Sequence, residues 1–169
     1  YAVIHMSYVV ESMNDKKSHY YQVDEYYNVT YNRSSEMVKL LAFDRYQESF
    51  FDSGYISKDR NSISMGVTNE SAEYVTSEDY GILAFVRLGQ LWMYKYNDSS
   101  LTNIFSYPQD SFSDARTLNT NLDINIADMD ADGNIYFVVY GYMNRGEHEG
   151  KNGMSLYYYS AESMTTQEL

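Results

Sequence analysis

The chain has 169 residues, with 20 Tyr and no Cys, and its 24 acidic and 12 basic residues give a net charge of −12. Hydrophobic residues make up 44%, which is enough for a sizeable core and excludes a disordered chain. The acidic charge excludes nucleic-acid binding, which needs a basic surface, because the densest basic pair is Lys16-Lys17. The lack of Cys excludes a disulfide scaffold and a thiolate metal site.

Membrane insertion is not expected from the hydrophobic pattern. Uncharged stretches such as residues 1–10 and 133–144 are shorter than the roughly 18 apolar residues of a membrane-spanning helix. The chain shows no signal peptide and begins with Tyr1, so we expect a mature or excised product. Many Tyr, Asn and Ser with strong acidity suit a bacterial extracytoplasmic protein. We therefore expect a secreted or cell-surface location, and one β domain over residues 1–169 within a longer chain.

Runs of β-branched and aromatic residues are broken by Asn, Asp, Ser and Gly along the chain, which predicts an all-β fold of antiparallel hairpins. The expected strands cover residues 2–10, 20–23, 26–31, 38–43, 54–57, 62–67, 82–87, 91–96, 101–105, 123–129, 135–142 and 154–159. Over residues 35–51 a helix is the alternative, because Met37, Leu40 and Leu41 also fit helical spacing.

Three short polar segments predict tight turns between these strands. Asp132-Gly133-Asn134 supplies residues that adopt the left-handed conformation a hairpin needs. Residues 88–90 and 97–100 separate strand-like runs in the same way.

A sequence repeat links two of the expected hairpins. Residues 91–96 and residues 154–159 are each followed by a polar turn and a Ser, at an offset of 63 (154 − 91). Residues 40–43, followed by Ser49, form a weaker third copy. Each copy is preceded by another strand-like run, so the chain consists of similar hairpin units.

This series resembles the blades of a β-propeller. Residues 132–137, 156–159 and 163–164 are similar to the inner hairpin of secreted, PQQ-like or WD40-like bacterial propellers, and the resemblance covers residues 26–169. It lacks their paired Gly-His and Trp-Asp motifs and their regular period. At about 40–50 residues per blade the chain would hold three to four blades, so the resemblance implies a small or partial propeller. A β-sandwich of hairpins is the alternative fold.

Asp128, Asp130 and Asp132 alternate ahead of Gly133 and form the sharpest local motif. Alternate carboxylates around a Gly turn can converge on Ca²⁺, which takes six to eight oxygen ligands. The motif resembles the first part of an EF-hand or dockerin loop, although the twelfth position is Val139 instead of the bidentate Glu. An ordinary hairpin with solvated Asp side chains is the alternative. Ca²⁺ is thus the one cofactor that the sequence suggests.

Residues 141–153 contain four Gly together with Arg145, Glu147, His148 and Glu149. Long charged loops on a rigid scaffold are common binding sites. We expect this loop to bind a polar ligand or an anion through Arg145 and backbone amides, or to assist a metal through His148. The alternative is a solvated connection between two strands.

Tyr pairs and triplets, such as residues 20–21 and 157–159, put phenol rings on both faces of a strand, so some must be exposed. Exposed Tyr with Trp92 can stack on sugar rings or grip a peptide. We therefore count Trp92 among the candidate ligand contacts. The alternative is that one aromatic face packs in the core and the other covers the sheet.

Catalytic motifs are lacking. The chain has no GxSxG elbow, P-loop, GxGxxG or Cys nucleophile, and nothing pairs His5, His19 or His148 with a nucleophile. We therefore expect a non-catalytic extracytoplasmic binding or scaffold module that contacts a protein or a glycan. The alternative is a glycan-active enzyme that uses paired carboxylates. The open sheet edges of a partial propeller also predict a homo-oligomer.

Overall fold

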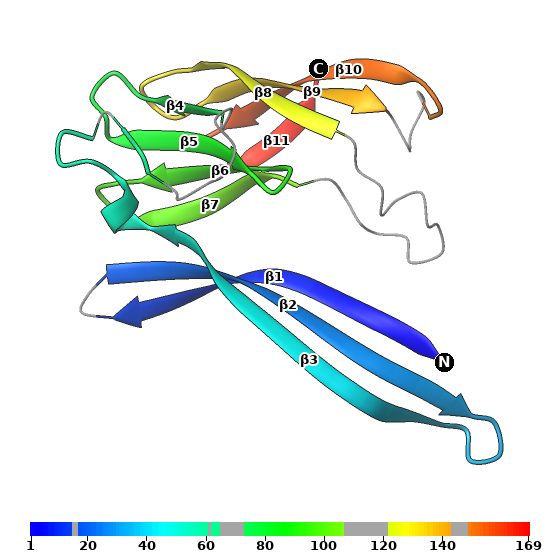
Figure 1. Ribbon diagram of the computed structural model, residues 1–169. Helices are drawn as coiled ribbons and strands as arrows, with labels where there is room; N and C mark the ends of the chain where they lie inside the picture. Colours follow the sequence, from blue (N-terminus) through cyan, green and yellow to red (C-terminus); the bar gives the residue numbers. More distant parts are fainter. Residues whose placement is uncertain (15–16, 61, 65–72, 107–121, 143–148) are drawn as a thin grey trace. The chain divides into compact units, whose positions relative to one another are not determined.

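The computed structural model describes residues 1–14, 17–60, 62–64, 73–106, 122–142 and 149–169 (Figure 1). Within these residues the fold is all-β, as predicted, with eleven strands in three antiparallel sheets. The chain divides into two compact units, unit 1 (Tyr1–Met65) and unit 2 (Gly66–Leu169).

Unit 1 is built on a three-stranded antiparallel sheet in the order β1-β2-β3. Its strands are β1 (Ala2–Asn14), β2 (Lys17–Asn32) and β3 (Met37–Asp52). The β1–β2 register is unbroken, whereas the β2–β3 register shifts after Tyr20 and after Asn28. Figure 1 shows the three strands as one long twisted ribbon, from blue to cyan.

Strand β2 joins two runs that the sequence had separated at Asp24-Glu25. These acids fit within the ladder because each has a partner in the sheet. The Asp24 carboxylate contacts the His5 ring at 2.8 Å, and the Glu25 carboxylate accepts a hydrogen bond from Tyr27 at 2.7 Å. The predicted break was therefore wrong.

Strand β3 also corrects two expectations. Residues 37–52 form a strand, so the alternative helix over residues 35–51 is wrong. Because β3 continues from Phe43 to Ser49 without a turn, the third copy of the repeat is not a hairpin.

Unit 1 ends in a short helical turn, η1 (Ser53–Tyr55), where the sequence predicted a strand. The Asp52 carboxylate starts this turn by accepting a hydrogen bond from the Gly54 N–H at 2.6 Å. Ile56 then forms an isolated antiparallel bridge with Ile63, the described remnant of the strand expected at residues 62–67.

Unit 2 contains two four-stranded antiparallel sheets, each made of consecutive strands, in the orders β4-β5-β6-β7 and β11-β10-β9-β8. The strands are β4 (Tyr74–Thr76), β5 (Ile82–Arg87), β6 (Gln90–Lys95), β7 (Ser100–Phe105), β8 (Leu122–Met129), β9 (Ile135–Tyr142), β10 (Asn152–Ser160) and β11 (Thr165–Glu168). β4 and β11 were not predicted, because β4 has only three residues and β11 has four residues, none of them apolar.

The predicted turns are confirmed, and their backbone explains them. Leu88 and Gly89 both have positive φ, 52° and 69°, as a two-residue hairpin turn requires. Three longer hairpins, β2–β3, β6–β7 and β10–β11, share a loop of four residues. The last loop residue has left-handed φ in each: Glu36, Ser99 and Met164 at 53°, 51° and 54°.

The sequence repeat corresponds to the β6–β7 and β10–β11 hairpins, but the structurally equivalent residues differ by two positions from those that the sequence matched. Lys95 pairs with Ser100 as Ser160 pairs with Thr165, whereas the sequence alignment matched Ser100 with Ser163. A slip of two residues keeps every side chain on its own face of the strand. The repeat was therefore recognisable although its register was wrong.

The hydrophobic core of unit 2 lies between its two sheets. Phe105 of β7 packs against Phe137 and Tyr157 of the other sheet, with ring centroids 5.3 and 5.0 Å apart. At the sheet edges, the Thr166 hydroxyl donates to the Ile104 carbonyl at 2.7 Å. The buried members of this core are Ala84, Leu91, Met93, Ile104, Ile124, Ile135, Phe137, Val139 and Tyr159.

The two sheets of unit 2 stack in the same sense. Equivalent strands define a front face, formed by Leu83, Phe85, Trp92 and Tyr94 in one sheet and by Ile135, Phe137, Tyr157 and Tyr159 in the other. The front face of the β8–β11 sheet enters the shared core, but in the β4–β7 sheet it is the opposite, back face that does so. The front face of the β8–β11 sheet therefore packs on the back face of the β4–β7 sheet. The two front faces do not meet, so the sheets follow one another as in a series of repeats.

Candidate functional site

The motif of alternating Asp residues forms the β8–β9 turn. The Asp130 carboxylate accepts hydrogen bonds from the N–H groups of Asp132 and Asn134, at 3.0 and 2.9 Å, and from the Asn134 side-chain amide at 2.8 Å. The bond from the Asn134 side chain is the main reason why the pKa of Asp130 lies below its ordinary value. Asp128 uses one oxygen to accept from the Met129 N–H at 3.0 Å.

The β4–β5 turn repeats this arrangement with a Ser in place of Asp130. Ser77 accepts from the Ile82 N–H at 3.0 Å and donates to Asp79 at 2.6 Å, and Asp79 accepts from the Gly81 N–H at 2.9 Å. Tyr80 closes the turn at a φ of 55°, where the β8–β9 turn has Gly133 at 89°.

A third turn of this kind lies in unit 1. Ser57 donates to Asp59 at 2.5 Å and accepts from the Ser62 N–H at 3.1 Å, and Arg60 has a φ of 60°. Sequence reasoning missed this repeat, although its signal was present as Ser-x-Asp at residues 57–59 and 77–79. The apolar runs do not reveal this repeat, because it lies in the turns between them.

The hydrogen bonds account for the Asp turn without an ion. Three N–H groups already occupy the Asp130 carboxylate. In the part of the chain that the structure describes, no three His, Asp or Glu side chains gather as a metal-binding group. Ca²⁺ binding by Asp128, Asp130 and Asp132 stays a prediction.

Gly133 has a structural role between the two sheets. A Cβ atom there would lie 3.0 Å from Ile82 Cδ1 and 3.3 Å from Met93 Sδ, both in the other sheet. Next to it, the Asn134 side-chain oxygen accepts from the Ala161 N–H of the β10–β11 loop at 2.9 Å. The turn therefore joins the two sheets and a neighbouring hairpin.

A polar cavity of about 430 Å³ opens beside this turn. It contains two carboxylates, from Asp132 and Glu162, and one ammonium group, from Lys95. Tyr158 supplies its aromatic part. Of the predicted site residues that the structure describes, Asp132 alone lines this cavity.

The charged loop connects β9 and β10, with its ends held by the Gly141–Gly153 and Tyr142–Asn152 pairs. Arg145, Glu147 and His148 lie outside the described residues. Glu149 is described and is exposed. The proposed ligand contacts of this loop stay a prediction.

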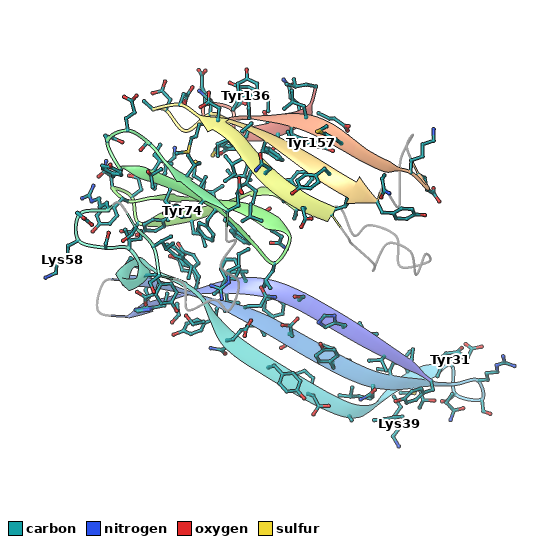
Figure 2. All side chains as sticks on the ribbon, turned by 45° about the horizontal axis from the view of Figure 1, so that its top comes forward. Tyr31, Lys39, Lys58, Tyr74, Tyr136 and Tyr157 are labelled. Carbon is teal, nitrogen blue, oxygen red and sulfur yellow. The ribbon has the colours of Figure 1, made fainter. Side chains whose placement is uncertain are left out.

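Trp92 is buried, with 8% of its surface exposed, so its ring does not belong to an exposed aromatic surface. Such a surface exists instead on the back face of the β8–β11 sheet, opposite the core. Figure 2 labels Tyr136 on this face and Tyr157 on the front face. The exposed apolar members of the back face are Tyr136, Tyr140, Tyr142, Met154 and Leu156.

No family model, curated protein or solved structure matches the chain. Within its described residues, no helix is long and apolar enough to cross a membrane.

Proposed function

We propose that this chain is a non-catalytic extracytoplasmic scaffold module made of propeller-like blades, which contacts a protein partner through the back face of the β8–β11 sheet. The front-on-back stacking of two similar four-stranded sheets is the observation that carries the proposal. Sheets that stack in one sense form an extendable series, as in propellers and other repeat proteins. A sandwich with two equivalent inner faces would close on itself.

The back face of the β8–β11 sheet is the open end of this series. Its counterpart in the β4–β7 sheet is covered by the front face of β8–β11. Tyr136, Tyr140 and Tyr142 are 44%, 42% and 47% exposed. With Met154 and Leu156 they leave on the order of 400 Å² of apolar surface, since burying one aromatic side chain removes about 150–250 Å². Exposed patches of this size mark interaction sites.

The expected occupant is a further β-sheet with an aromatic, apolar face. Within this chain, Phe137 and Tyr157 already play that part for the β4–β7 sheet. Unit 2 contains 15 acidic and 5 basic residues, so a partner with a basic rim would be favoured. Secretion or surface exposure of the whole protein rests on composition alone.

A tandem variant tests this stacking. Residues 73–169 are repeated after Leu169, so that the added β4–β7 sheet can place its Phe85 and Trp92 face on the open back face. We expect one cooperative unfolding transition at a higher urea midpoint than in the single chain, because each added repeat contributes an interface. Tyr140→Lys in the first copy should remove the gain, whereas Met164→Lys, in an exposed loop, should keep it. Two independent transitions, one of them at the single-chain midpoint, would contradict the proposal.

The polar cavity supports a second candidate, a glycan-active enzyme, because Asp132 and Glu162 both line it. A paired-carboxylate mechanism needs an acid and a base or nucleophile flanking one bond. Release of reducing ends from soluble polysaccharides by the wild type, abolished in Glu162→Gln and in Asp132→Asn, would favour it. If the wild type releases no reducing ends, the enzyme candidate is excluded for these substrates and the scaffold function is favoured.

A further inference from the structure

The sheet of unit 1 has one apolar and one polar face. Opposed residues on its three strands share a face, and two such rows are Ile4–Tyr27–Phe43 and Ala2–Val29–Leu40. We call the side they form the apolar face of unit 1. It comprises Ala2, Ile4, Met6, Tyr27, Val29, Tyr31, Val38, Leu40 and Phe43.

The opposite side of the sheet is polar and engaged in its own contacts. His5 stacks on Tyr26 with ring centroids 4.4 Å apart and contacts Asp24 at 2.8 Å. Tyr46 lies on the same side, edge-on to Tyr26. Alternation of this kind is typical of a sheet with one face in water and one face buried.

The apolar face is nevertheless exposed. Ile4, Met6, Phe43 and Leu40 keep 44%, 48%, 46% and 52% of their surface accessible. All residues from 31 to 49 are exposed, which includes most of β3. Figure 2 shows Tyr31 and Lys39 at the β2–β3 hairpin end of this sheet. Toward the β2–β3 hairpin this face is therefore uncovered, whereas Val23, on the same face nearer the β1–β2 hairpin, is buried. An uncovered apolar face needs another layer to exclude water.

The charges on this face cancel. Glu25 is 9% exposed, accepts from the Tyr27 hydroxyl at 2.7 Å and lies 3.7 Å from Arg45 Nε. Hydrogen bonding to Glu25 is the main cause that raises the pKa of Tyr27, so this phenol stays protonated and donates. One acid and one base, with an otherwise apolar surface, leave no net charge to repel an identical face.

The charge distribution of the chain points to the same occupant. Unit 1 holds 9 acidic and 7 basic residues, against 15 and 5 in unit 2. Two copies meeting through unit 2 would oppose strongly negative surfaces, whereas two copies meeting through unit 1 would not.

The sheet of unit 1 has room for a dimer interface of ordinary size. The whole sheet, with strands of 13 and 16 residues spaced about 4.8 Å apart at about 3.3 Å per residue, covers roughly 600–750 Å². A standard interface buries about 800 Å² per partner, of which the rim is polar. The apolar face covers the part of this area toward the β2–β3 hairpin and would form the centre of such a contact.

We propose that the apolar face of unit 1 packs against the same face of a second copy of this chain, in a two-fold symmetric dimer. Symmetry makes the contact self-complementary, so each apolar row meets an apolar row. The closed interface then holds two Glu25 and two Arg45 side chains, which keeps every buried acid beside a base. Both edges of the sheet stay outside the contact.

Sedimentation velocity of the full chain between about 1 and 200 µM tests the dimer. We expect a concentration-dependent monomer–dimer equilibrium in the wild type. Phe43→Lys should weaken it about 100-fold or more, because the dimer would bury a lysine from each copy. Tyr46→Lys is the matched control: it is an exposed aromatic in the same strand on the polar face, and it should leave the equilibrium unchanged.

Leu40→Lys repeats the test at a second position, and unchanged far-UV circular dichroism would show that both variants fold. A wild type that stays monomeric at 200 µM would overturn the proposal. A dimer that persists in both variants would also overturn it. Dissociation by Leu156→Lys instead would place the contact on the back face of the β8–β11 sheet, which refutes this interface and leaves the proposed function standing.

Discussion

Unit 1 and unit 2 use the same kind of strand in opposite ways. In unit 2 each four-stranded sheet meets a second layer, and Phe137 and Ile135 are fully buried between them. In unit 1 the strands are longer, yet Phe43 and Leu40, in the part of the sheet toward the β2–β3 hairpin, stay about half exposed. Long strands alone therefore do not bury the face of a sheet, because burial requires a second layer. It also locates the surfaces where this chain needs partners.

The largest expected effect comes from replacing one phenylalanine of each unit by alanine. Phe137→Ala should cost about 3–5 kcal/mol of unfolding free energy, because it opens a cavity in the core of unit 2. Phe43→Ala should cost less than about 1 kcal/mol in the monomer, because its ring is half solvated already. Urea denaturation at low protein concentration measures both. Equal costs would remove the distinction between the units.

Gly133 lies where the β8–β9 turn of one sheet of unit 2 packs closely against the other sheet. Gly133→Ala should cost about 2–4 kcal/mol, because Cβ at positive φ is strained and would also press on Ile82 and Met93. Gly89 also has positive φ, but no heavy atom lies within 4 Å of an added Cβ there. Gly89→Ala should therefore cost about 1–2 kcal/mol of unfolding free energy. If urea denaturation gives the same loss for both, the turn does not press on the other sheet.

Glu73 ties the same two sheets together through hydrogen bonds. Its carboxylate accepts from the Asn125 side chain and from the Ile126 N–H, both at 2.9 Å. Glu73→Ala should therefore cost about 1–3 kcal/mol, and Glu73→Gln, which keeps one oxygen acceptor, should cost less. Thermal unfolding monitored by circular dichroism measures the two variants. A neutral Glu73→Ala would mean that this link is not formed in solution.

The smallest expected effect concerns acid stability. Because the pKa of Asp130 is lowered in the folded chain, its contribution is complete above its ordinary pKa of 3.8 and is lost as the pH falls through the lower, folded value. Asp130→Ser should keep the turn, as Ser57 and Ser77 do in the equivalent turns, and should flatten the pH dependence below pH 4. Unfolding midpoints between pH 2 and pH 6 report this difference. If the unfolding midpoint of Asp130→Ser still falls with pH as in the wild type, other carboxylates cause that fall.

The sequence predicted the elements of unit 2 better than those of unit 1. The bounds of β5 and β9 agreed with the expectation because short apolar runs end in turns with a strong chemical signal, such as Asp132-Gly133-Asn134. In unit 1 the acids Asp24 and Glu25 resemble a turn in the sequence, but they stay within β2 because His5 of β1 contacts Asp24 and Arg45 of β3 lies beside Glu25. Single-sequence patterns do not contain such partners, since these depend on register.

The candidate site was predictable only in part. The Asp turn was recognised from spacing, but its role in joining two sheets depends on Asn134 and Gly133 contacts across the core. The burial of Trp92 and the exposure of Tyr140 also depend on which face of a strand meets the other layer. Composition gives no information about that choice, and the stacking sense became visible only from the paired strands.

Hydrogen–deuterium exchange measured by mass spectrometry at two protein concentrations tests the central claim that the apolar face of unit 1 is uncovered in the monomer. The account predicts that peptides from β3, around Leu40 and Phe43, exchange rapidly at about 1 µM and become protected at about 200 µM. Peptides from β9, around Phe137, should be protected equally at both concentrations. Strong protection of β3 that does not depend on concentration would contradict the account, because the apolar face of unit 1 would then be covered without a second copy.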